Sequence, residues 1–128
     1  MEPQKTVETG GVLAVEDDHR IRRLIETVLE GEGYNVVSAS NGREALDLLD
    51  STRPGVILLD LMMPGLDGWA FLRKIREQGI DAPVVLVSAI SDLPHEARRL
   101  GTDSLAKPFA VEDLISKVEA HIHEGARS

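Results

Sequence analysis

The feature that most constrains the fold is a fivefold alternation of short, mostly apolar runs with segments of helical periodicity. Strands are predicted at 12–15, 34–39, 56–59, 83–87 and 104–106, and helices begin near 21, 42, 68, 94 and 111. Runs that are apolar throughout, such as 84–87, are typical of parallel strands covered on both faces. Because crossovers between parallel strands are right-handed, the sequence predicts one doubly wound α/β sandwich with a five-stranded sheet.

Length and composition limit the classes of protein to which the chain can belong. Its 128 residues suit one domain, expected over 11–124, and the absence of cysteine excludes disulfides and thiolate metal sites. Residues 1–10 are expected to be a disordered leader and 125–128 a tail. No apolar run reaches membrane-spanning length, which favours a cytoplasmic protein. The net charge of -8 disfavours direct binding to nucleic acid or to an anionic membrane.

Charged side chains follow three of the predicted strands. Glu16 and Asp17 follow the first strand, Asp60 follows the third and Lys107 follows the fifth. In α/β folds the carboxyl ends of strands carry the chemistry, so these side chains are expected to converge. Converging carboxylates repel one another unless a cation joins them, and the candidates are a divalent metal and the Lys107 ammonium. Such a site is suited to handling a phosphoryl group.

Four motifs in a fixed order resemble those of the response-regulator receiver domain, the phosphoacceptor module of two-component signalling. They are Glu16-Asp17, the Asp-x-x-Met-Pro-x-x-Asp-Gly run from Asp60 to Gly68, Ser88-Ala89, and Lys107-Pro108-Phe109. The resemblance covers about 11–123. It implies a flavodoxin-like strand order of 2-1-3-4-5, which would make strands 1 and 3 neighbours and set Asp17 beside Asp60.

The resemblance also implies a role for each catalytic residue. Asp60 resembles the phosphoacceptor, Ser88 the hydroxyl that moves to bond the phosphoryl oxygen, and Lys107 the lysine that pairs with phosphate. A cis Lys107–Pro108 bond is implied as well. The expected function is that of a single-domain regulator, phosphorylated by a histidine kinase or a histidine phosphotransfer protein. It would catalyse only its own phosphorylation and dephosphorylation, and would signal by binding an unidentified output protein.

A magnesium ion is the cofactor that the resemblance implies. Asp17 and Asp60 resemble direct ligands, Met62 resembles the residue that offers a backbone carbonyl, and Glu16 resembles the partner that holds the ion through water. Mg²⁺ keeps several waters and takes few carboxylates, which suits this set.

The sequence departs from the family pattern in the segment before Lys107. Ser88 and Lys107 are 19 positions apart, fewer than expected, and Pro94 lies early between them, which predicts a shortened fourth helix. Ser104 stands near the place where the family usually has an aromatic residue in strand 5.

Other interpretations remain open for the same residues. An aspartate-nucleophile phosphohydrolase would need an acid where Met62 stands, and a flavin mononucleotide carrier would need a phosphate loop in place of Glu16 and Asp17. A receiver-like scaffold that is never phosphorylated is a further alternative. Asp18 is interpreted as a helix cap. The four histidines, His121 among them, are expected to be solvated, and Trp69 is expected to serve packing.

Overall fold

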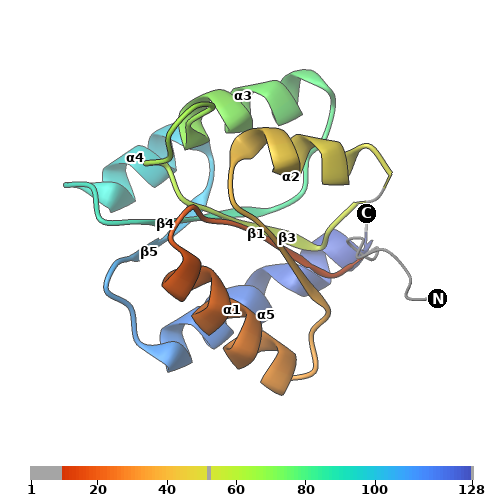
Figure 1. Ribbon diagram of the computed structural model, residues 1–128, viewed down its shortest axis with the longest axis vertical. Coiled ribbons are helices and arrows are strands. Elements are labelled where there is room, and N and C mark those ends of the chain that lie inside the picture. Colours follow the sequence, from red (N-terminus) through yellow and green to blue (C-terminus); the bar gives the residue numbers. More distant parts are fainter. Residues whose placement is uncertain (1–9, 52, 128) are drawn as a thin grey trace.

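The computed structural model describes residues 10–51 and 53–127, with side chains up to residue 122. Its sheet has five parallel strands in the order β2-β1-β3-β4-β5, which confirms the predicted doubly wound, flavodoxin-like fold (Figure 1). The strands are β1 (Val12–Val15), β2 (Val36–Ala39), β3 (Val56–Leu59), β4 (Val84–Ser88) and β5 (Asp103–Ala106). The predicted leader lies, apart from Gly10, outside the described residues.

Five helices cover the two faces of the sheet. They are α1 (His19–Gly31), α2 (Gly42–Leu49), α3 (Gly68–Glu77), α4 (Leu93–Leu100) and α5 (Val111–Arg127). Figure 1 shows α1 and α5 on one face and α2, α3 and α4 on the other. With eight residues, α4 is as short as the sequence predicts.

The central strands are apolar throughout because each side of the sheet has its own core. Leu13, Ile57 and Leu86 pack toward the face of α2, α3 and α4. Their strand neighbours point the other way, toward α1 and α5, as Leu58 and Val85 do. Burying one such side chain contributes about 1.5–3 kcal/mol to the stability of the fold. Because the same strands send side chains to both faces, they hold both layers of helices.

Polar caps fix where the helices that border the site begin. Asp18 accepts the N–H of Arg20 at 2.8 Å, which confirms its predicted capping role for α1. Asn41 accepts the N–H of Glu44 at 2.8 Å before α2. Asp67 accepts the N–H of Ala70 at 2.9 Å before α3. Each cap is worth about 1 kcal/mol.

Element boundaries differ from the prediction where local contacts decide them. Strand β2 begins at Val36 rather than at 34, because the N–H of Tyr34 bonds Leu29 O and so completes the end of α1. Helix α5 continues to Arg127, past the predicted end near 123, and includes residues expected to form the tail. A glycine such as Gly125 weakens a helix by only about 1 kcal/mol and does not by itself end it.

Candidate functional site

Strands β1 and β3 place two carboxylates side by side. Val15 pairs with Leu59 in the parallel register, so the chain leaves both strands at the same level. Val15 O accepts the N–H of Asp60 at 3.0 Å, and Glu16 follows Val15 directly. Both acids are almost fully buried, with Glu16 2% and Asp60 4% exposed. Two buried carboxylates this close require a positive partner.

Lys107 is that partner in the described structure. Its N–H bonds Ser88 O at 2.9 Å, which fixes the backbone where β5 ends. Its Nζ lies 2.6 Å from Glu16 Oε1 and 3.1 Å from Asp60 Oδ2. The Lys107–Pro108 peptide bond is cis, as the resemblance implies. One ammonium therefore joins the two acids that the strands bring together.

Burial and neighbouring charges have opposite effects on the pKa values of Glu16 and Lys107. Burial raises the pKa of Glu16 to about 7, although contacts with Lys107 and with the Asp18 N–H lower it. Burial acts to lower the pKa of Lys107, but the hydrogen bond and charge of Glu16, together with Asp60, outweigh it and leave the pKa raised. The site therefore favours a second cation beside the lysine.

The donor set fits a divalent cation. Glu16, Asp17 and Asp60 each offer an oxygen, and these oxygens lie within 4.8 Å of one another. Asp17 is exposed and can be reached from solvent, whereas Glu16 and Asp60 are not. Glu16 is buried, and its Oε1 has Lys107 Nζ as a partner at 2.6 Å. Hard cations such as Mg²⁺ prefer oxygen ligands of this kind.

The two remaining predicted residues lie at the border of the acid cluster. The N–H of Met62 donates to Asp60 Oδ1 at 3.1 Å, and the Met62 side chain is 60% exposed. Ser88 is fully buried at the end of β4, and its Oγ accepts the N–H of Ile90 at 3.3 Å. Ser88 thus ends the strand next to β3, and its side-chain hydrogen bond is with Ile90 rather than with Asp60. The roles of these residues stay predictions.

Two residues at the site were missed by reasoning from the sequence. Arg22 on α1 donates to Glu16 O at 2.9 Å and to Asp17 O at 3.0 Å, which holds the acidic loop. A Cβ on Gly68 would lie 2.5 Å from Asp60 O, so only glycine lets α3 start against the loop that follows β3. The Asp-Gly pair predicted a helix start, but no sequence signal indicated this close approach.

The family model for the response regulator receiver domain matches residues 12–119. The chain belongs to this family. It is therefore a receiver of two-component signalling, and a receiver is generally not an enzyme in the usual sense.

Several named relatives are similar to this receiver along most of its length. The uncharacterized transcriptional regulatory protein YkoG of Bacillus subtilis is 36% identical over 92% of the chain and 53% of its own length. The response regulator MprA of Mycolicibacterium vanbaalenii is 39% identical over 85% of the chain and 48% of its own length. The chain thus spans about half the length of the curated relatives that it matches.

Solved receiver structures share the fold. The receiver domain of Francisella response regulator 1452 has a TM-score of 0.83 and 36% identity, and the match covers 89% of this chain and 97% of that one. The response regulator TrrA of Thermotoga maritima, solved with Mg²⁺ and BeF, has a TM-score of 0.76 and 32% identity, with coverage of 85% and 96%.

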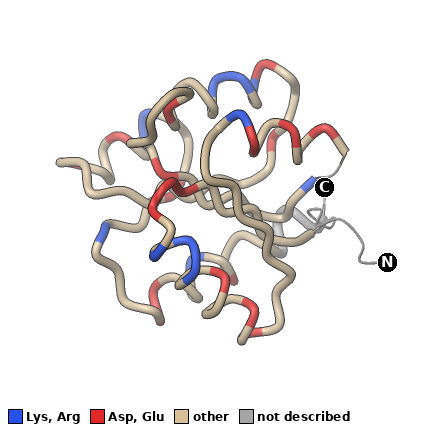
Figure 2. The backbone as a smooth tube through the Cα atoms, in the orientation of Figure 1, with Lys and Arg blue, Asp and Glu red and all other residues tan. Residues whose placement is uncertain are grey.

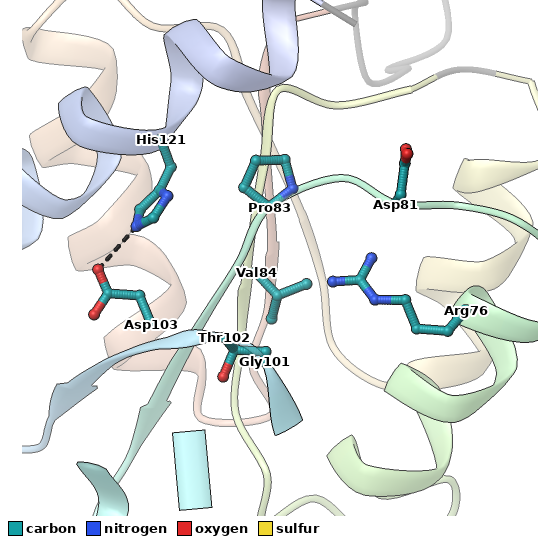
Figure 3. Close-up of a pocket in the computed structure, with 8 residues that line it drawn as sticks. All are labelled: Arg76, Asp81, Pro83, Val84, Gly101, Thr102, Asp103 and His121. Carbon is teal, nitrogen blue, oxygen red and sulfur yellow. Dashed lines mark hydrogen bonds and ion pairs between the residues drawn. The ribbon is translucent and has the colours of Figure 1, made fainter. Parts of the chain in front are cut away.

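A second polar cluster lies at the opposite end of the receiver's sheet and corrects one expectation. His121 was expected to be solvated, but its Nε2 lies 2.8 Å from Asp103 Oδ2 (Figure 3). Lys117 Nζ also contacts Asp103, at 2.7 Å. The pair forms because β5 starts beside the C-terminal part of α5. Asp103 and His121 line a hollow of about 500 Å³ that is separate from the acid cluster.

Trp69 does pack against the core, as expected, but it also has a polar partner. Its Nε1 donates to Glu96 Oε1 at 3.0 Å, which joins α3 to α4.

Among the residues that the structure describes, no helix is long and apolar enough to cross a membrane.

Proposed function

We propose that this receiver is a phosphorylation switch in which Asp60 accepts a phosphoryl group from a histidine kinase or a histidine phosphotransfer protein. The observation that carries the proposal is the Lys107 ammonium held 3.1 Å from Asp60 Oδ2 and 2.6 Å from Glu16 Oε1. The contact places a positive charge beside the carboxylate that would attack phosphorus, where charge develops during phosphoryl transfer.

In the proposed reaction an Asp60 carboxylate oxygen attacks phosphorus, the O–P bond forms, and the P–N bond to the donor imidazole breaks. The electron pair of that bond leaves with the donor histidine. Lys107 then pairs with a phosphoryl oxygen, because its ammonium already contacts the attacking carboxylate. The Met62 N–H holds the other Asp60 oxygen at 3.1 Å and so orients the carboxylate.

The proposed metal site uses Asp17, Asp60 and the Met62 carbonyl as ligands, with Glu16 acting through water. Bound Mg²⁺ would neutralise charge on the transferring phosphoryl oxygens. The three carboxylates within 4.8 Å of one another support this assignment. Arg22, which bonds the carbonyls of Glu16 and Asp17, fixes the loop that presents them.

Output is proposed to follow from movement of Ser88 toward the phosphoryl group. Its Oγ bonds only the Ile90 N–H at 3.3 Å, so a phosphoryl oxygen can compete for the hydroxyl. Such movement would displace the segment between β4 and α4 and change a surface that an output protein binds. We propose no direct contact of the receiver itself with nucleic acid or membrane.

The test is phosphorylation by a small donor. Purified protein is incubated with Mg²⁺ and acetyl phosphate or phosphoramidate, and the intact mass is followed. We expect one added phosphate on the wild type and on Asp81→Asn, a matched exposed control, and none on Asp60→Asn. If Asp60→Asn is modified as fully as the wild type, Asp60 is not the acceptor.

The phosphohydrolase alternative gains no support at the site. The position two residues after Asp60 is Met62, whose thioether cannot protonate a leaving group. Release of inorganic phosphate from p-nitrophenyl phosphate by the wild type but not by Asp60→Asn would favour the hydrolase instead.

A further inference from the structure

A basic groove lies between α3 and α4, on an otherwise acidic molecule. Five of the chain's 14 Lys and Arg residues lie on these two helices, with only two of its 22 Asp and Glu residues. The cationic residues are Arg73, Lys74, Arg76, Arg98 and Arg99. Figure 2 shows blue segments on α3 along the top of the view. The whole chain has a net charge of -8, so this surface opposes the charge of the molecule.

The groove has an apolar floor and a cationic rim. It is a hollow of about 320 Å³, lined by Trp69, Leu72, Arg73, Arg76, Arg99 and Leu100. Leu72 is buried, and Trp69 is half-buried. The hydrogen bond from Trp69 to Glu96 spans the two helices at 3.0 Å and keeps the indole at the edge of the hollow.

Two of the three arginines on the rim, Arg73 and Arg76, pair with no carboxylate of the described residues. Arg73 is exposed, and its side chain makes no ion pair or hydrogen bond with any residue that the structure describes. Arg99 pairs with Glu96 of its own helix. Arg76 donates Nη1 to Ile80 O at 2.8 Å and to Ala82 O at 3.0 Å, which holds its guanidinium in place without neutralising it. Arginine binds carboxylates with two parallel hydrogen bonds, and its planar group suits this use.

We propose that the α3–α4 groove binds an acidic peptide segment of a partner protein, with an apolar side chain on Trp69 and Leu72 and carboxylates on Arg73 and Arg76. Tryptophan and arginine are the residue types that most often dominate binding energy at protein interfaces. The charge complementarity of an acidic segment with this rim would also speed encounter.

The shape of the surface favours a peptide over a nucleic acid. A nucleic acid needs cations spaced along its backbone, whereas these are confined to helices of ten and eight residues. Beyond the groove the acidic remainder of the chain would repel a long polyanion. The apolar floor offers no hydrogen bond to a nucleic-acid phosphate, but it accommodates the side chain of a leucine or phenylalanine.

The groove borders the loop that follows the phosphoacceptor. Trp69 also lines a smaller hollow with Leu61, Met62 and Met63, so one side chain belongs to both surfaces. The proposal does not depend on phosphorylation, and its test uses unmodified protein. Failure of the test therefore leaves the role of Asp60 untouched.

The test uses Trp69 as a probe, because it is the only tryptophan in the chain. A synthetic peptide with Leu-Phe between two runs of four Glu is titrated into the full chain. The indole N–H signal is followed by NMR and the emission by fluorescence. We expect a saturable shift, and binding weakened about tenfold when every Glu of the peptide is replaced by Gln. Equal binding of the two peptides would overturn the proposal.

Charge-reversal variants locate the binding surface. Arg73→Glu is expected to weaken the peptide about tenfold, whereas Arg23→Glu, the same charge change on the exposed side of α1, should alter binding less than twofold. An equal loss of peptide affinity in both variants would show only a general charge effect and would overturn the proposal. A ten-nucleotide oligo-dT that binds tighter than the peptide would assign the surface to nucleic acid. If the Trp69 signal shifts when the protein concentration is raised without peptide, the groove is instead the contact surface for a second copy of the chain.

Discussion

At the scale of single residues, the proposed function depends on one lysine placed between two buried acids. Lys107 contacts Glu16 and Asp60 together, and both carboxylates are nearly inaccessible to solvent. Breaking such a buried arrangement leaves an uncompensated charge, so the three residues are expected to act as a unit. Met62 stands two positions after Asp60 and Ile90 two positions after Ser88, and neither has a hydrogen-bonding side chain.

Because Met62 and Ile90 are apolar, we expect the phosphoryl group to be lost slowly. Hydrolysis needs a water held in line with the Asp60 acyl phosphate, and neither Met62 nor Ile90 can hold one. We expect the double variant Met62→Asn with Ile90→Glu to lose phosphate several-fold faster. The measurement is the decay of phosphorylated protein by intact mass after the donor is removed. Decay no faster than that of the wild type would refute the water-access argument.

At the scale of elements, close backbone contacts set where helices meet the site. Gly68 starts α3 against the Asp60 loop, and its N–H bonds Leu61 O at 3.0 Å. Asp103 similarly joins the start of β5 to α5 through Lys117 and His121. Both contacts fix a helix relative to a strand end, so the loss of either should lower the free energy of unfolding.

Gly68→Ala is expected to destabilise the fold. The added Cβ would lie 2.5 Å from Asp60 O and 2.6 Å from Leu61 Cα, so α3 or the loop must shift. Overpacking of this kind costs about 1–3 kcal/mol in free energy of unfolding. Urea unfolding followed by Trp69 fluorescence measures it. Gly31→Ala, where nothing lies within 4 Å, is the control and should be neutral or stabilising. Equal effects would contradict the steric explanation.

The contact between β5 and α5 predicts a loss of stability in acid. Burial acts to raise the pKa of Asp103, but hydrogen bonds from Lys117, His121 and the Ser104 N–H lower it to about 2. Because the folded pKa lies below the ordinary 3.8, this stabilisation is present above pH 3.8 and is lost as the pH falls toward 2. It is worth about 1–2 kcal/mol after allowing for partial exposure.

Asp103→Asn should therefore be less stable than the wild type at neutral pH, and the difference should shrink between pH 4 and pH 2. Urea unfolding at a series of pH values measures it. Asp81→Asn, which borders the same hollow, is the control. A difference that stays constant down to pH 2 would rule out the ion pair as its cause.

At the scale of the whole molecule, charge is distributed unevenly. The chain carries a net charge of -8, three carboxylates meet at the proposed metal site, and cationic residues gather on α3 and α4. Lys107 contacts only two of these three carboxylates, so repulsion remains and the fold itself should respond to Mg²⁺. Ligands that bind only the folded state stabilise it by mass action.

Millimolar MgCl₂ is expected to raise the melting temperature by a few degrees more than NaCl of equal ionic strength. Asp17→Ala should abolish this extra rise, because the exposed ligand is gone, and should nearly abolish phosphorylation. It should also melt no lower than the wild type without Mg²⁺, since one repelling carboxylate is removed. Differential scanning calorimetry measures the melting temperatures and intact mass measures phosphorylation, and an unchanged Mg²⁺ response in the variant would contradict the site.

The sequence alone determined those features that depend on local pattern. Apolar runs predicted the strands, Asp18 predicted a cap, and the order of Glu16, Asp60 and Lys107 predicted one site at the strand ends. The strand order, which came from the family resemblance, made β1 and β3 neighbours, and all parallel strands of a sheet end at the same edge, so the three residues were expected to lie together.

Contacts between distant elements were decided only by the tertiary structure. The bond from Trp69 to Glu96, the pairing of Asp103 with His121, and the approach of Gly68 to Asp60 O each join segments whose separation no local pattern encodes. Helix packing sets these distances, and it depends on how side chains of both cores fit together. The basic groove between α3 and α4 follows from the same packing, which is why the sequence showed its arginines but not the surface that they form.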